Sequence, residues 1–427
     1  MTHDDHTTSA VTSAVAIVGA GTIGRIHAEA VGRHPRLRVA AIVDPDVAAR
    51  HKLAEHIALS ENFGRGDASE TRENSGHGKH GEHGERSPIA APAEFDSLSE
   101  ALAAGGIDLV AVCVPTGLHS AAVTEALAAG VHVLVEKPID VSLPEARRLA
   151  ALAEDAARRG IVSSVISQHR FDPASAVVAA AIADGRMGRV TSAVASVAWW
   201  RSQEYYDSAQ WRGTWALDGG GALMNQGVHT VDLLAWFLGR PVEVSAHAAT
   251  LAHESIEVED VAVATVRFAS GALAVLHATT AAYPGLSVRL QIHGSTGSAV
   301  LHDDQLEYFH VAQHGTGETG GPYGGAEPDN QASRAVPEAE LRGNPKPADA
   351  FIVSHLRQYE DVVDAIETGR PPTVTFQDGL MALAIVRAVY VSSTLKRPVA
   401  IDALLAGDYD DVAVAVAVAV AVDTATA

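Results

Sequence analysis

The sequence predicts an α/β protein: a doubly wound parallel sheet first, then an α+β domain with an open, mostly antiparallel sheet. Three observations lead to this assignment. A glycine-rich turn joins the first apolar run to the first helical pattern. Apolar runs then alternate with helical patterns as far as residue 166, as they do in parallel sheets. From residue 189 onward, short β-rich runs follow one another closely, which is typical of antiparallel sheets.

The first apolar run, residues 15–18, leads into three glycines with the spacing G-x-G-x-x-G, and a helical pattern follows. Gly19 permits a tight turn, Gly21 lets backbone N–H groups approach a pyrophosphate, and Gly24 lets the helix pack closely on the strand. The N-terminus of that helix presents its partial positive charge to the phosphates. The residues predicted to bind the dinucleotide here are Gly19, Gly21, Thr22, Ile23 and Gly24.

A second predicted strand, residues 37–43, ends at Asp44, twenty residues after Gly24. In dinucleotide-binding folds, an acid at this distance accepts hydrogen bonds from a ribose diol. Asp44 would also repel a 2′-phosphate, and Pro45 follows it where an arginine could have received that phosphate. We therefore predict a Rossmann domain that binds NAD in preference to NADP.

The remaining elements of the first domain continue the alternation. Its further predicted helices are residues 47–59, 117–129 and 143–159, and its further predicted strands are residues 108–114, 131–136 and 161–166. Residues 61–92 are rich in glycine, histidine and glutamate, and we interpret them as a disordered insertion. A metal site built on His77, His80 and His83 is the less favoured alternative, and no metal is predicted. The domain is expected to span residues 13–166.

The second domain, for substrate binding and oligomerisation, is expected at residues 167–405. Its predicted strands are residues 189–200, 242–252, 261–268, 272–281, 286–293 and 298–302, and its predicted helices are residues 222–238, 348–367 and 377–395. Residues 406–427 form a low-complexity tail in which valine and alanine alternate from residue 412 to residue 422. That tail is expected either to extend an exposed sheet edge or to remain unstructured.

Composition narrows the range of partners. With 31 basic and 52 acidic residues, the chain carries a formal charge of −21, which disfavours nucleic acid. Cys113 is the only cysteine, so an internal disulfide and a cysteine-based metal cluster are excluded. We find no apolar stretch with the length and character of a membrane span and no signal-peptide pattern, so we expect a cytoplasmic protein without a membrane partner.

Ligands of doubly wound folds lie at the C-terminal ends of the strands, where two polar clusters are expected. Pro115, Thr116 and His119 follow one strand. Thr116 is expected to cap the next helix and to lie beside the dinucleotide, whereas His119 either touches a ligand or packs within the helix. Glu136 and Lys137 follow the next strand, and all five residues are predicted to bind the cofactor. Lys137 can steady a substrate hydroxyl and its alkoxide character, the alternative being a solvated surface lysine.

A third cluster is the glycine-rich segment 219–232, which contains Asn225 and His229. These two residues are four apart and so share one face of a helix. An imidazole with a pKa near neutrality suits removal of a hydroxyl proton, and Asn225 either orients it or binds the substrate. The alternative for His229 is a histidine satisfied within the core.

The glycine turn at residues 19–24, the Glu136-Lys137-Pro138 triplet and segment 219–232 resemble, in this order, the Gfo/Idh/MocA family of glucose–fructose oxidoreductases and inositol dehydrogenases. The resemblance extends over about residues 13–400, without the insertion. It implies a Rossmann domain joined to an open, mostly antiparallel sheet. It also implies an oxidoreductase that uses NAD(P) and a dimeric or tetrameric assembly.

The resemblance further implies that Lys137 and His229 are the catalytic pair for a secondary alcohol of a sugar or cyclitol. Asn225 departs from the inositol dehydrogenase pattern, which has aspartate at this position. Asparagine occurs there in members that resemble nucleotide-sugar dehydrogenases. Without that carboxylate, His229 must act alone or through Lys137 and solvent.

Four of the five tryptophans lie within residues 199–215, directly before the glycine-rich segment. Aromatic faces suit the C–H faces of a sugar ring, and arginines suit hydroxyls, carboxylates or phosphates, although core packing explains part of this cluster. The predicted substrate ligands, which include candidates from two other segments, are Gln168, Arg170, Trp200, Arg201, Trp211, Arg212, Asn225 and His229.

These features predict hydride transfer between nicotinamide C4 and a secondary carbinol carbon. Two alternatives stay open within the same fold: a nucleotide-sugar dehydrogenase and an imine reductase. A third is a dinucleotide-binding protein without catalysis, which would have no need of Lys137 and His229. We also expect a homo-oligomer, because an apolar sheet face that helices leave bare is usually buried against a partner.

Overall fold

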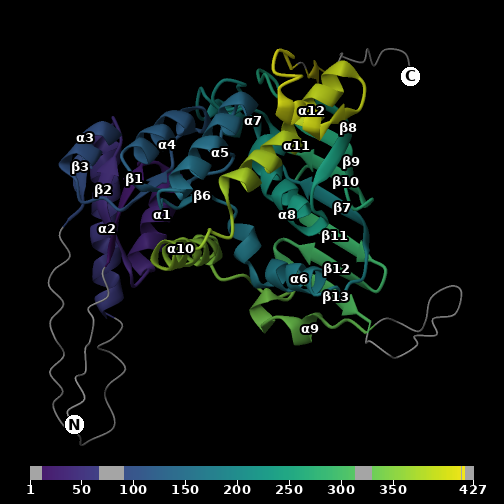
Figure 1. Cartoon of the computed structure of the whole chain (residues 1–427), viewed down its shortest axis with the longest axis horizontal. Helices are drawn as coiled ribbons and strands as arrows, with labels where there is room; N and C mark the ends of the chain where they lie inside the picture. The colour runs from purple at the N-terminus through teal and green to yellow at the C-terminus, as the bar shows by residue number, and fades with distance from the viewer. Residues whose placement is uncertain (1–11, 67–90, 313–328, 415, 419–427) are drawn as a thin grey trace, which may run out of the picture.

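The computed structural model describes residues 12–66, 91–312, 329–414 and 416–418. Two sheets stand side by side, the parallel one in purple to blue and the second in teal to green (Figure 1). The parallel sheet has the strand order β3-β2-β1-β4-β5-β6, which confirms the doubly wound prediction. Its strands are β1 (Ser13–Val18), β2 (Leu37–Val43), β3 (Ala93–Phe95), β4 (Leu109–Val112), β5 (His132–Val135) and β6 (Ser163–Val165).

Helices cover both faces of this sheet, which explains why its strands are apolar throughout. Val15 and Ile17 of β1 belong to a core beneath α1 (Thr22–Arg33), α2 (Val47–Gly66) and α10 (Ala350–Thr368). Ala16 and Val18 face the opposite core, which α3 (Leu98–Ala104), α4 (His119–Ala128) and α5 (Leu143–Ala157) cover. Helix α10, from late in the chain, lies beside α1 in Figure 1.

Two elements of this half differ from the sequence prediction. Strand β3 and helix α3 are not predicted, because β3 has only three residues and α3 only seven. Helix α2 runs to Gly66, beyond the predicted end at residue 59, so the start of the predicted insertion is helical. The rest of that insertion, residues 67–90 with its three histidines, lies outside the described residues.

The second sheet has the order β13-β12-β11-β7-β10-β9-β8-β14, and β15 also pairs with β8. Only the β7/β10 and β8/β15 pairs are parallel, so the mostly antiparallel prediction is confirmed. Its strands are β7 (Val190–Ala198), β8 (Pro241–Thr250), β9 (Val261–Phe268), β10 (Leu273–Thr279), β11 (Val288–Gly294), β12 (Gly297–His302), β13 (Gln305–Val311), β14 (Val399–Ala400) and β15 (Ala417–Val418).

One face of the second sheet packs against helices, and the sequence misses one of them. The longer helices of this half are α6 (Pro173–Ala183), α8 (Val228–Leu238) and α11 (Phe376–Leu395). Its short helical turns are η2 (Gln168–Phe171), α7 (Gln203–Asp207), η3 (Ala222–Gly227), α9 (Ala332–Ala335), η4 (Glu338–Glu340) and α12 (Ile401–Ala406). Helix α6 consists almost entirely of alanine and valine, so it shows no helical periodicity in the sequence. Strand β13 is also not predicted.

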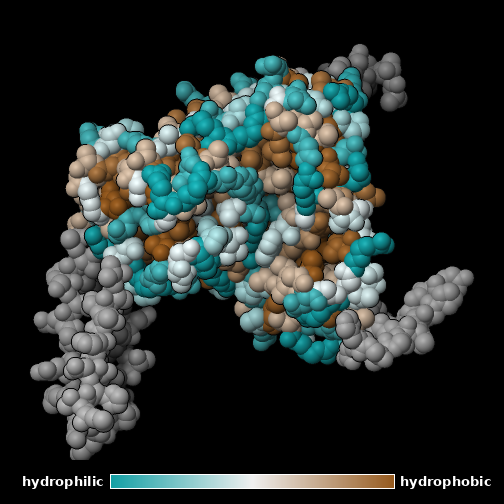
Figure 2. Space-filling view, in the orientation of Figure 1, coloured by the Kyte–Doolittle hydropathy of each residue, from teal (hydrophilic) through white to brown (hydrophobic). Residues whose placement is uncertain are grey.

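Helix α11 is the one described helix that is long and apolar enough to cross a membrane, so the prediction that no stretch has this length and apolarity is wrong. It packs against β8, α5 and α8, and 61% of its apolar window is buried. On the face in Figure 2, hydrophobic residues form separate patches among hydrophilic ones and no continuous band. These contacts identify α11 as a core helix that joins the two halves.

The tail takes the first of its two predicted forms where the structure describes it. Strand β15 pairs in parallel with β8, through Ala417 opposite Ala249 and Val418 opposite Thr250. It therefore extends the exposed edge of the second sheet. Residues 419–427 lie outside the described residues.

Candidate active site

The glycine turn between β1 and α1 forms a cradle that fits a pyrophosphate. Gly19 has φ +104° and donates its N–H to the Val43 carbonyl at 2.8 Å. A Cβ on Gly24 would lie 1.9 Å from the Gly19 carbonyl oxygen, so only glycine allows α1 to approach the turn this closely. At Gly21, nothing lies within 4 Å of a Cβ position, and no side chain caps α1. The N–H groups around Thr22 and Ile23 are therefore available to an anionic ligand.

Asp44 stands at the mouth of this turn. Its Oδ2 accepts the Ala20 N–H at 2.8 Å, and its Oδ1 accepts the Asp46 N–H at 2.9 Å. The neighbouring Arg50 donates to the Asp44 carbonyl, but its charge is paired with Asp96 at 2.6 Å and Glu94 at 3.6 Å. The C-terminal end of β2, where the ribose is predicted to bind, therefore carries a carboxylate and a guanidinium that is already paired.

A groove of about 690 Å³ runs between α1 and α2 beside the glycine turn. Gly21 and Asp46 line it, together with the basic side chains of Arg25 and Lys52. The groove therefore brings acidic and basic groups close to the predicted cofactor site.

Thr116 does not cap a helix, and the ring of His119 is not placed to contact a ligand. Thr116 is the first residue of η1 (Thr116–Leu118), directly after Pro115, and no side-chain cap is formed there or at α4, so the capping prediction is wrong. The His119 ring is buried, with Nδ1 2.9 Å from the Pro138 carbonyl and Nε2 3.0 Å from the Val114 carbonyl. Both nitrogens face backbone oxygens, so His119 packs within the helix.

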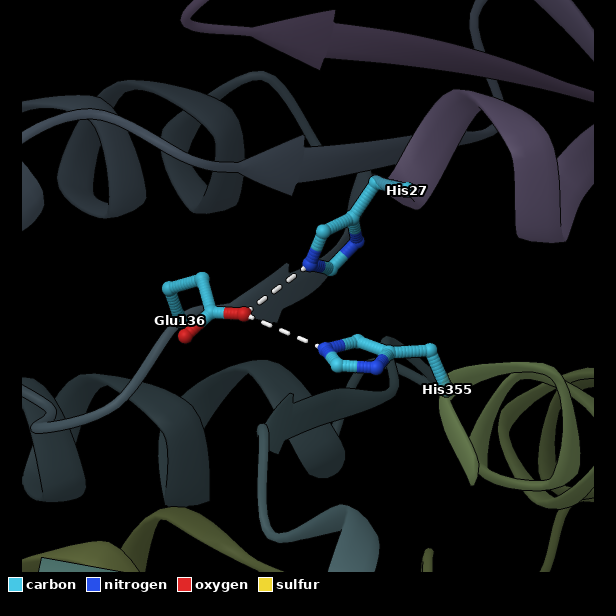
Figure 3. Close-up of side chains that lie close together, drawn as sticks. All are labelled: His27, Glu136 and His355. Atoms are coloured by element: carbon cyan, nitrogen blue, oxygen red, sulfur yellow. Dashed lines mark hydrogen bonds and ion pairs between the residues drawn. The ribbon is translucent and has the colours of Figure 1, made fainter. Parts of the chain in front are cut away.

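Glu136, a predicted cofactor ligand, lies buried between α1 and α10 (Figure 3). Its Oε1 is 3.1 Å from Nε2 of His27 and 3.5 Å from Nε2 of His355, and its Oε2 accepts the Lys137 N–H at 3.0 Å. Burial raises the pKa of Glu136, but the bonds and charges of the two histidines outweigh it and hold the pKa well below its usual value. A carboxylate thus connects the end of β5 to both helices.

Lys137, Asn225 and His229 come together in the structure. The Lys137 Nζ donates to the Asn225 carbonyl at 3.2 Å, and Lys137 and His229 line one cavity of about 20 Å³. Burial lowers the pKa of His229 well below its usual value, and the charges of Lys137 and His169 lower it further. His229 is therefore neutral at physiological pH, the form that can accept a proton.

Asp218 is a site residue that sequence reasoning misses. Its Oδ1 accepts a hydrogen bond from Asn225 Nδ2 at 2.7 Å, and its Oδ2 accepts the Gly213 N–H at 2.9 Å. Burial raises the pKa of Asp218 to about 6, against the N–H of Gly213 and the charges of Arg212 and Lys137. The acid lies directly before the three glycines, so its place in the motif is the signal that could have found it.

The segment that carries Asn225 is π-helical over Ala222–Gly227, where an ordinary helix is predicted, and α8 continues it through His229. Single π-helical turns are frequent at functional sites. Buried Glu259 secures its start by accepting the N–H groups of Gly221 at 2.9 Å and Leu223 at 2.8 Å. Burial raises the pKa of Glu259 to about 7. Glu259 lies 38 residues from Gly221, so the sequence gives no local signal for it.

Arg170 and Gln168, both predicted substrate ligands, are buried in η2. Arg170 forms two bonds to Asp232, at 2.7 and 2.6 Å, and one to Asp378 at 3.1 Å. The Arg170 guanidinium is therefore paired with two carboxylates, those of Asp232 and Asp378. In the described part of the chain, Arg170 therefore joins η2 to α8 and α11.

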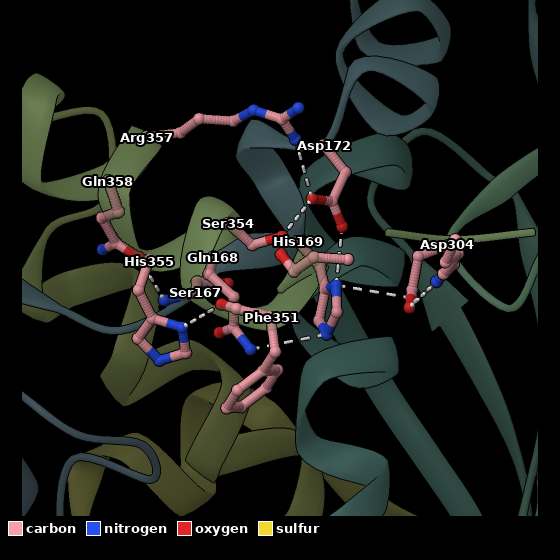
Figure 4. A network of polar contacts seen from close by, with 12 residues as sticks. Ser167, Gln168, His169, Asp172, Asp304, Phe351, Ser354, His355, Arg357 and Gln358 are labelled. Atoms are coloured by element: carbon pink, nitrogen blue, oxygen red, sulfur yellow. Dashed lines mark hydrogen bonds and ion pairs between the residues drawn. The ribbon is translucent and has the colours of Figure 1, made fainter. Parts of the chain in front are cut away.

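His169, between these two residues, is a further neighbour that the sequence does not single out. Its Nδ1 lies 2.7 Å from Asp172 and 3.4 Å from Asp304, within a network that reaches α10 (Figure 4). Burial lowers the pKa of His169, but the two carboxylates outweigh it and raise the pKa to about 9. Its ring packs edge-on against His229 with centroids 4.9 Å apart. His169 thus places a positive charge beside the His229 ring.

The tryptophan-rich segment divides into two parts. Trp200 is 37% exposed and packs on Tyr283 with ring centroids 5.4 Å apart, at the surface of the second sheet. Arg201, Trp211 and Arg212 are partly buried and cluster with Tyr205 nearer to the π-helical turn.

Comparisons with known proteins agree with this architecture. Residues 13–164 match the oxidoreductase family with an NAD-binding Rossmann fold of the Gfo/Idh/MocA group, and residues 176–300 match the Gfo/Idh/MocA C-terminal domain. Inositol 2-dehydrogenase of Rhizobium meliloti is 26% identical over 394 residues, covering 90% of this chain and 98% of that protein.

The names of two further relatives mention a cofactor, and one of them also mentions a bound nucleotide sugar. The scyllo-inositol 2-dehydrogenase (NADP(+)) IolW of Bacillus subtilis is 26% identical over 310 residues, covering 69% of this chain and 79% of that protein. The WlbA dehydrogenase of Bordetella pertussis, solved with NADH and UDP-GlcNAcA, is 26% identical with a TM-score of 0.70. The match covers 91% of this chain and 98% of that one.

Proposed function

This chain belongs to the Gfo/Idh/MocA family of NAD(P)-binding oxidoreductases, and we propose that it transfers a hydride between nicotinamide and a secondary alcohol or ketone of a sugar, cyclitol or sugar derivative. One observation carries this proposal: Lys137 and His229 line the same cavity, where burial, and after it the charge of Lys137, lowers the pKa of His229 and keeps its ring neutral. A cation and a neutral base together are what oxidation of an alcohol needs.

In the oxidation direction, His229 accepts the hydroxyl proton of the substrate. Lys137, whose Nζ is 3.2 Å from the Asn225 carbonyl, stabilises the negative charge that develops on that oxygen. A bound nicotinamide supplies the acceptor for the hydride that leaves the carbinol carbon. Reduction runs the same steps in reverse, with His229 returning the proton.

Asp218 supplies a carboxylate close to position 225, where this chain has asparagine, and it orients the Asn225 side chain. Because Asn225 Nδ2 donates to Asp218, the amide oxygen of Asn225 is turned away from that carboxylate and can accept a hydrogen bond. We assign this oxygen to a substrate hydroxyl or to the His229 ring. Asp218 is then a positioning residue for the proton transfer.

Two substitutions test the catalytic pair. Lys137→Ala and His229→Ala should each lower kcat by at least ~100-fold while leaving NADH affinity and the unfolding temperature close to those of the parent protein. His247→Ala is the control, because His247 is an exposed histidine on β8. Turnover is followed by nicotinamide absorbance across cyclitols, aldoses and nucleotide sugars. A near-normal kcat in either variant would remove that residue from the mechanism.

The same panel, with an imine substrate added, separates the rival functions. A dinucleotide-binding protein without catalysis would bind NADH and turn over no member of the panel, and an imine reductase would respond only to imine substrates. A nucleotide sugar is the second candidate substrate class. The WlbA dehydrogenase was solved in complex with a nucleotide sugar, UDP-GlcNAcA. Asn225 is also the residue expected at this position in family members that resemble nucleotide-sugar dehydrogenases.

For the cofactor, we propose NAD over NADP. Asp44 offers a carboxylate to the ribose diol, and the guanidinium of Arg50 is paired with Asp96 rather than free for a 2′-phosphate. NADH should therefore stabilise the protein against heat more than NADPH does at equal concentration. Asp44→Ala should narrow that difference, and stronger stabilisation by NADPH would overturn the preference. In that case Arg25 and Lys52, which line the groove beside the glycine turn, would be the candidates for binding the 2′-phosphate.

A further inference from the structure

Two arginine side chains share a single aromatic ring next to the candidate active site. The guanidinium carbon of Arg201 lies 5.2 Å from the centroid of Tyr205, and that of Arg212 lies 4.3 Å from it. Arg201 also stacks on Trp199 at 5.0 Å, and Arg212 stacks on Trp211 at 4.6 Å. Stacking fixes the plane of a guanidinium and leaves the N–H groups at its edge directed outward.

Neither guanidinium has an ion-pair partner within the described residues. Among the described residues, the Arg201 guanidinium donates only to the neighbouring Trp200 carbonyl, at 3.2 Å, and the Nε atoms of both Arg201 and Arg212 are buried without a hydrogen-bond partner. Arg36 and Arg170, by contrast, each bind two or more carboxylates. Partial burial of a cation without an ion pair is unfavourable. The chain has 52 acidic residues, yet no described carboxylate forms an ion pair with either guanidinium.

The arginine pair is connected to the catalytic residues by two short links. Gln226, the neighbour of Asn225, lies with its Nε2 3.5 Å from the Tyr205 hydroxyl, and its Oε1 is buried without a partner. On the other side, Gly213 follows Arg212 directly and donates its N–H to the Asp218 carboxylate that also holds Asn225. The pair therefore borders the site where the substrate reacts.

We propose that Arg201 and Arg212 bind an anionic group of the substrate, a carboxylate or a phosphate, that lies apart from the reacting carbinol. This rests on the proposed function of the same site. The edge of a guanidinium matches two oxygens of a carboxylate or of a phosphate and binds them through two parallel hydrogen bonds. A neutral cyclitol would leave both guanidiniums without an ion-pair partner. The substrate class is accordingly a sugar acid or a phosphorylated sugar, nucleotide sugars included.

Matched substrates test the proposal. Glucose, glucuronate, glucose 6-phosphate, UDP-glucose and UDP-glucuronate are compared at low and high ionic strength. The parent protein should show at least ~10-fold higher kcat/KM for an anionic member than for its neutral counterpart, which is the scale of one charged hydrogen bond. Added salt should raise KM for the anionic members. Preference for a sugar carboxylate or for a phosphate then identifies the source of the charge.

Substitutions connect that preference to the two residues. Arg201→Gln and Arg212→Gln should each raise KM for the anionic member by ~10-fold or more, while KM for the neutral member and NADH affinity stay within about twofold. Arg212→Lys keeps the charge without the paired N–H groups, so it should recover part of the loss. Arg240→Gln is the control, because Arg240 pairs with Asp402 at the protein surface. An equal rise in KM for both members would assign the arginines to structure and overturn the proposal.

A binding measurement separates this proposal from hydride transfer. Glucuronate and inorganic phosphate are titrated into the NADH-loaded parent protein and the double variant Arg201→Gln/Arg212→Gln by calorimetry. Binding that only the parent shows supports the anion site even if no panel member is turned over, in which case the proposed function fails alone. Turnover of neutral members without arginine-dependent anion binding would refute the proposed anion site and would still support the proposed hydride transfer.

Discussion

His229 is the side chain whose protonation state controls the proposed chemistry. Burial lowers its pKa, and the charges of Lys137, His169 and His355 lower it further against the opposing charge of Glu136. Alcohol oxidation needs the neutral ring, which is lost only when the pH falls through this lowered pKa. We therefore expect kcat/KM for oxidation to stay level as the pH falls below about 6.5, the ordinary histidine value. The measurement is a pH–rate profile with saturating NAD.

The neighbouring cation provides a second test of that profile. His169 has a pKa of about 9, so it is charged at neutral pH, and His169→Asn removes that charge. The acidic limb of the His229 profile should then move to higher pH, toward the ordinary value. His310→Asn, distant in sequence on β13, should leave the limb in place. An unchanged limb in His169→Asn would mean that the charge of His169 does not contribute to the lowered pKa of His229.

Residues whose role follows from position at a strand end could be predicted from the sequence. Lys137 belongs to this group, since it lies two residues after the end of β5. Asp218, Glu259 and His169 could not be predicted, because their roles arise from contacts with residues elsewhere in the fold. The ion pairs of Arg170, a predicted substrate ligand, could not be predicted either, because the two carboxylates that bind it come from helices distant in the sequence.

Among the elements, the π-helical turn η3 depends on one close approach. A Cβ on Gly221 would lie 1.7 Å from the Glu259 carbonyl oxygen, whereas a Cβ on Gly32 of α1 would meet nothing within 4 Å. Gly221→Ala should lower the free energy of unfolding by about 1–3 kcal/mol and reduce kcat, because Asn225 moves with the turn. Gly32→Ala should leave the stability unchanged or raise it by up to about 1 kcal/mol. Denaturant unfolding of both variants checks this pair, and equal stabilities would contradict it.

Element type was predictable wherever burial imposed a simple pattern. The strands of the parallel sheet are buried on both faces, and β9 shows strict alternation of exposed and buried residues, so both kinds were recognised. Strand β3 was missed because three residues carry too little pattern. The π-helical form of η3 was missed for a different reason. Its geometry depends on tertiary contacts at Gly221 and Glu259, which no local periodicity encodes.

At the scale of the whole molecule, α11 joins the two halves, and no described helix covers the opposite face of the second sheet. Val194, Val263, Leu273 and Val275 are exposed there, at 37%, 44%, 58% and 47%. They lie on the adjacent strands β7, β10 and β9, and Val194 and Val275 are direct neighbours across a strand pair. The four side chains therefore form one apolar patch, of the kind that is usually buried against a partner.

We expect this face to join copies of the chain into a dimer or tetramer. Light scattering at micromolar concentration should then give a mass that is a multiple of 44.4 kDa. Val275→Lys places a charge at the centre of the patch, where it would be desolvated in the assembly, so its mass should fall toward 44.4 kDa. Leu59→Lys is the matched control, because Leu59 is 60% exposed on α2, away from the second sheet. A monomeric mass for the parent protein refutes the assembly, and an oligomeric Val275→Lys variant would place the interface on another face.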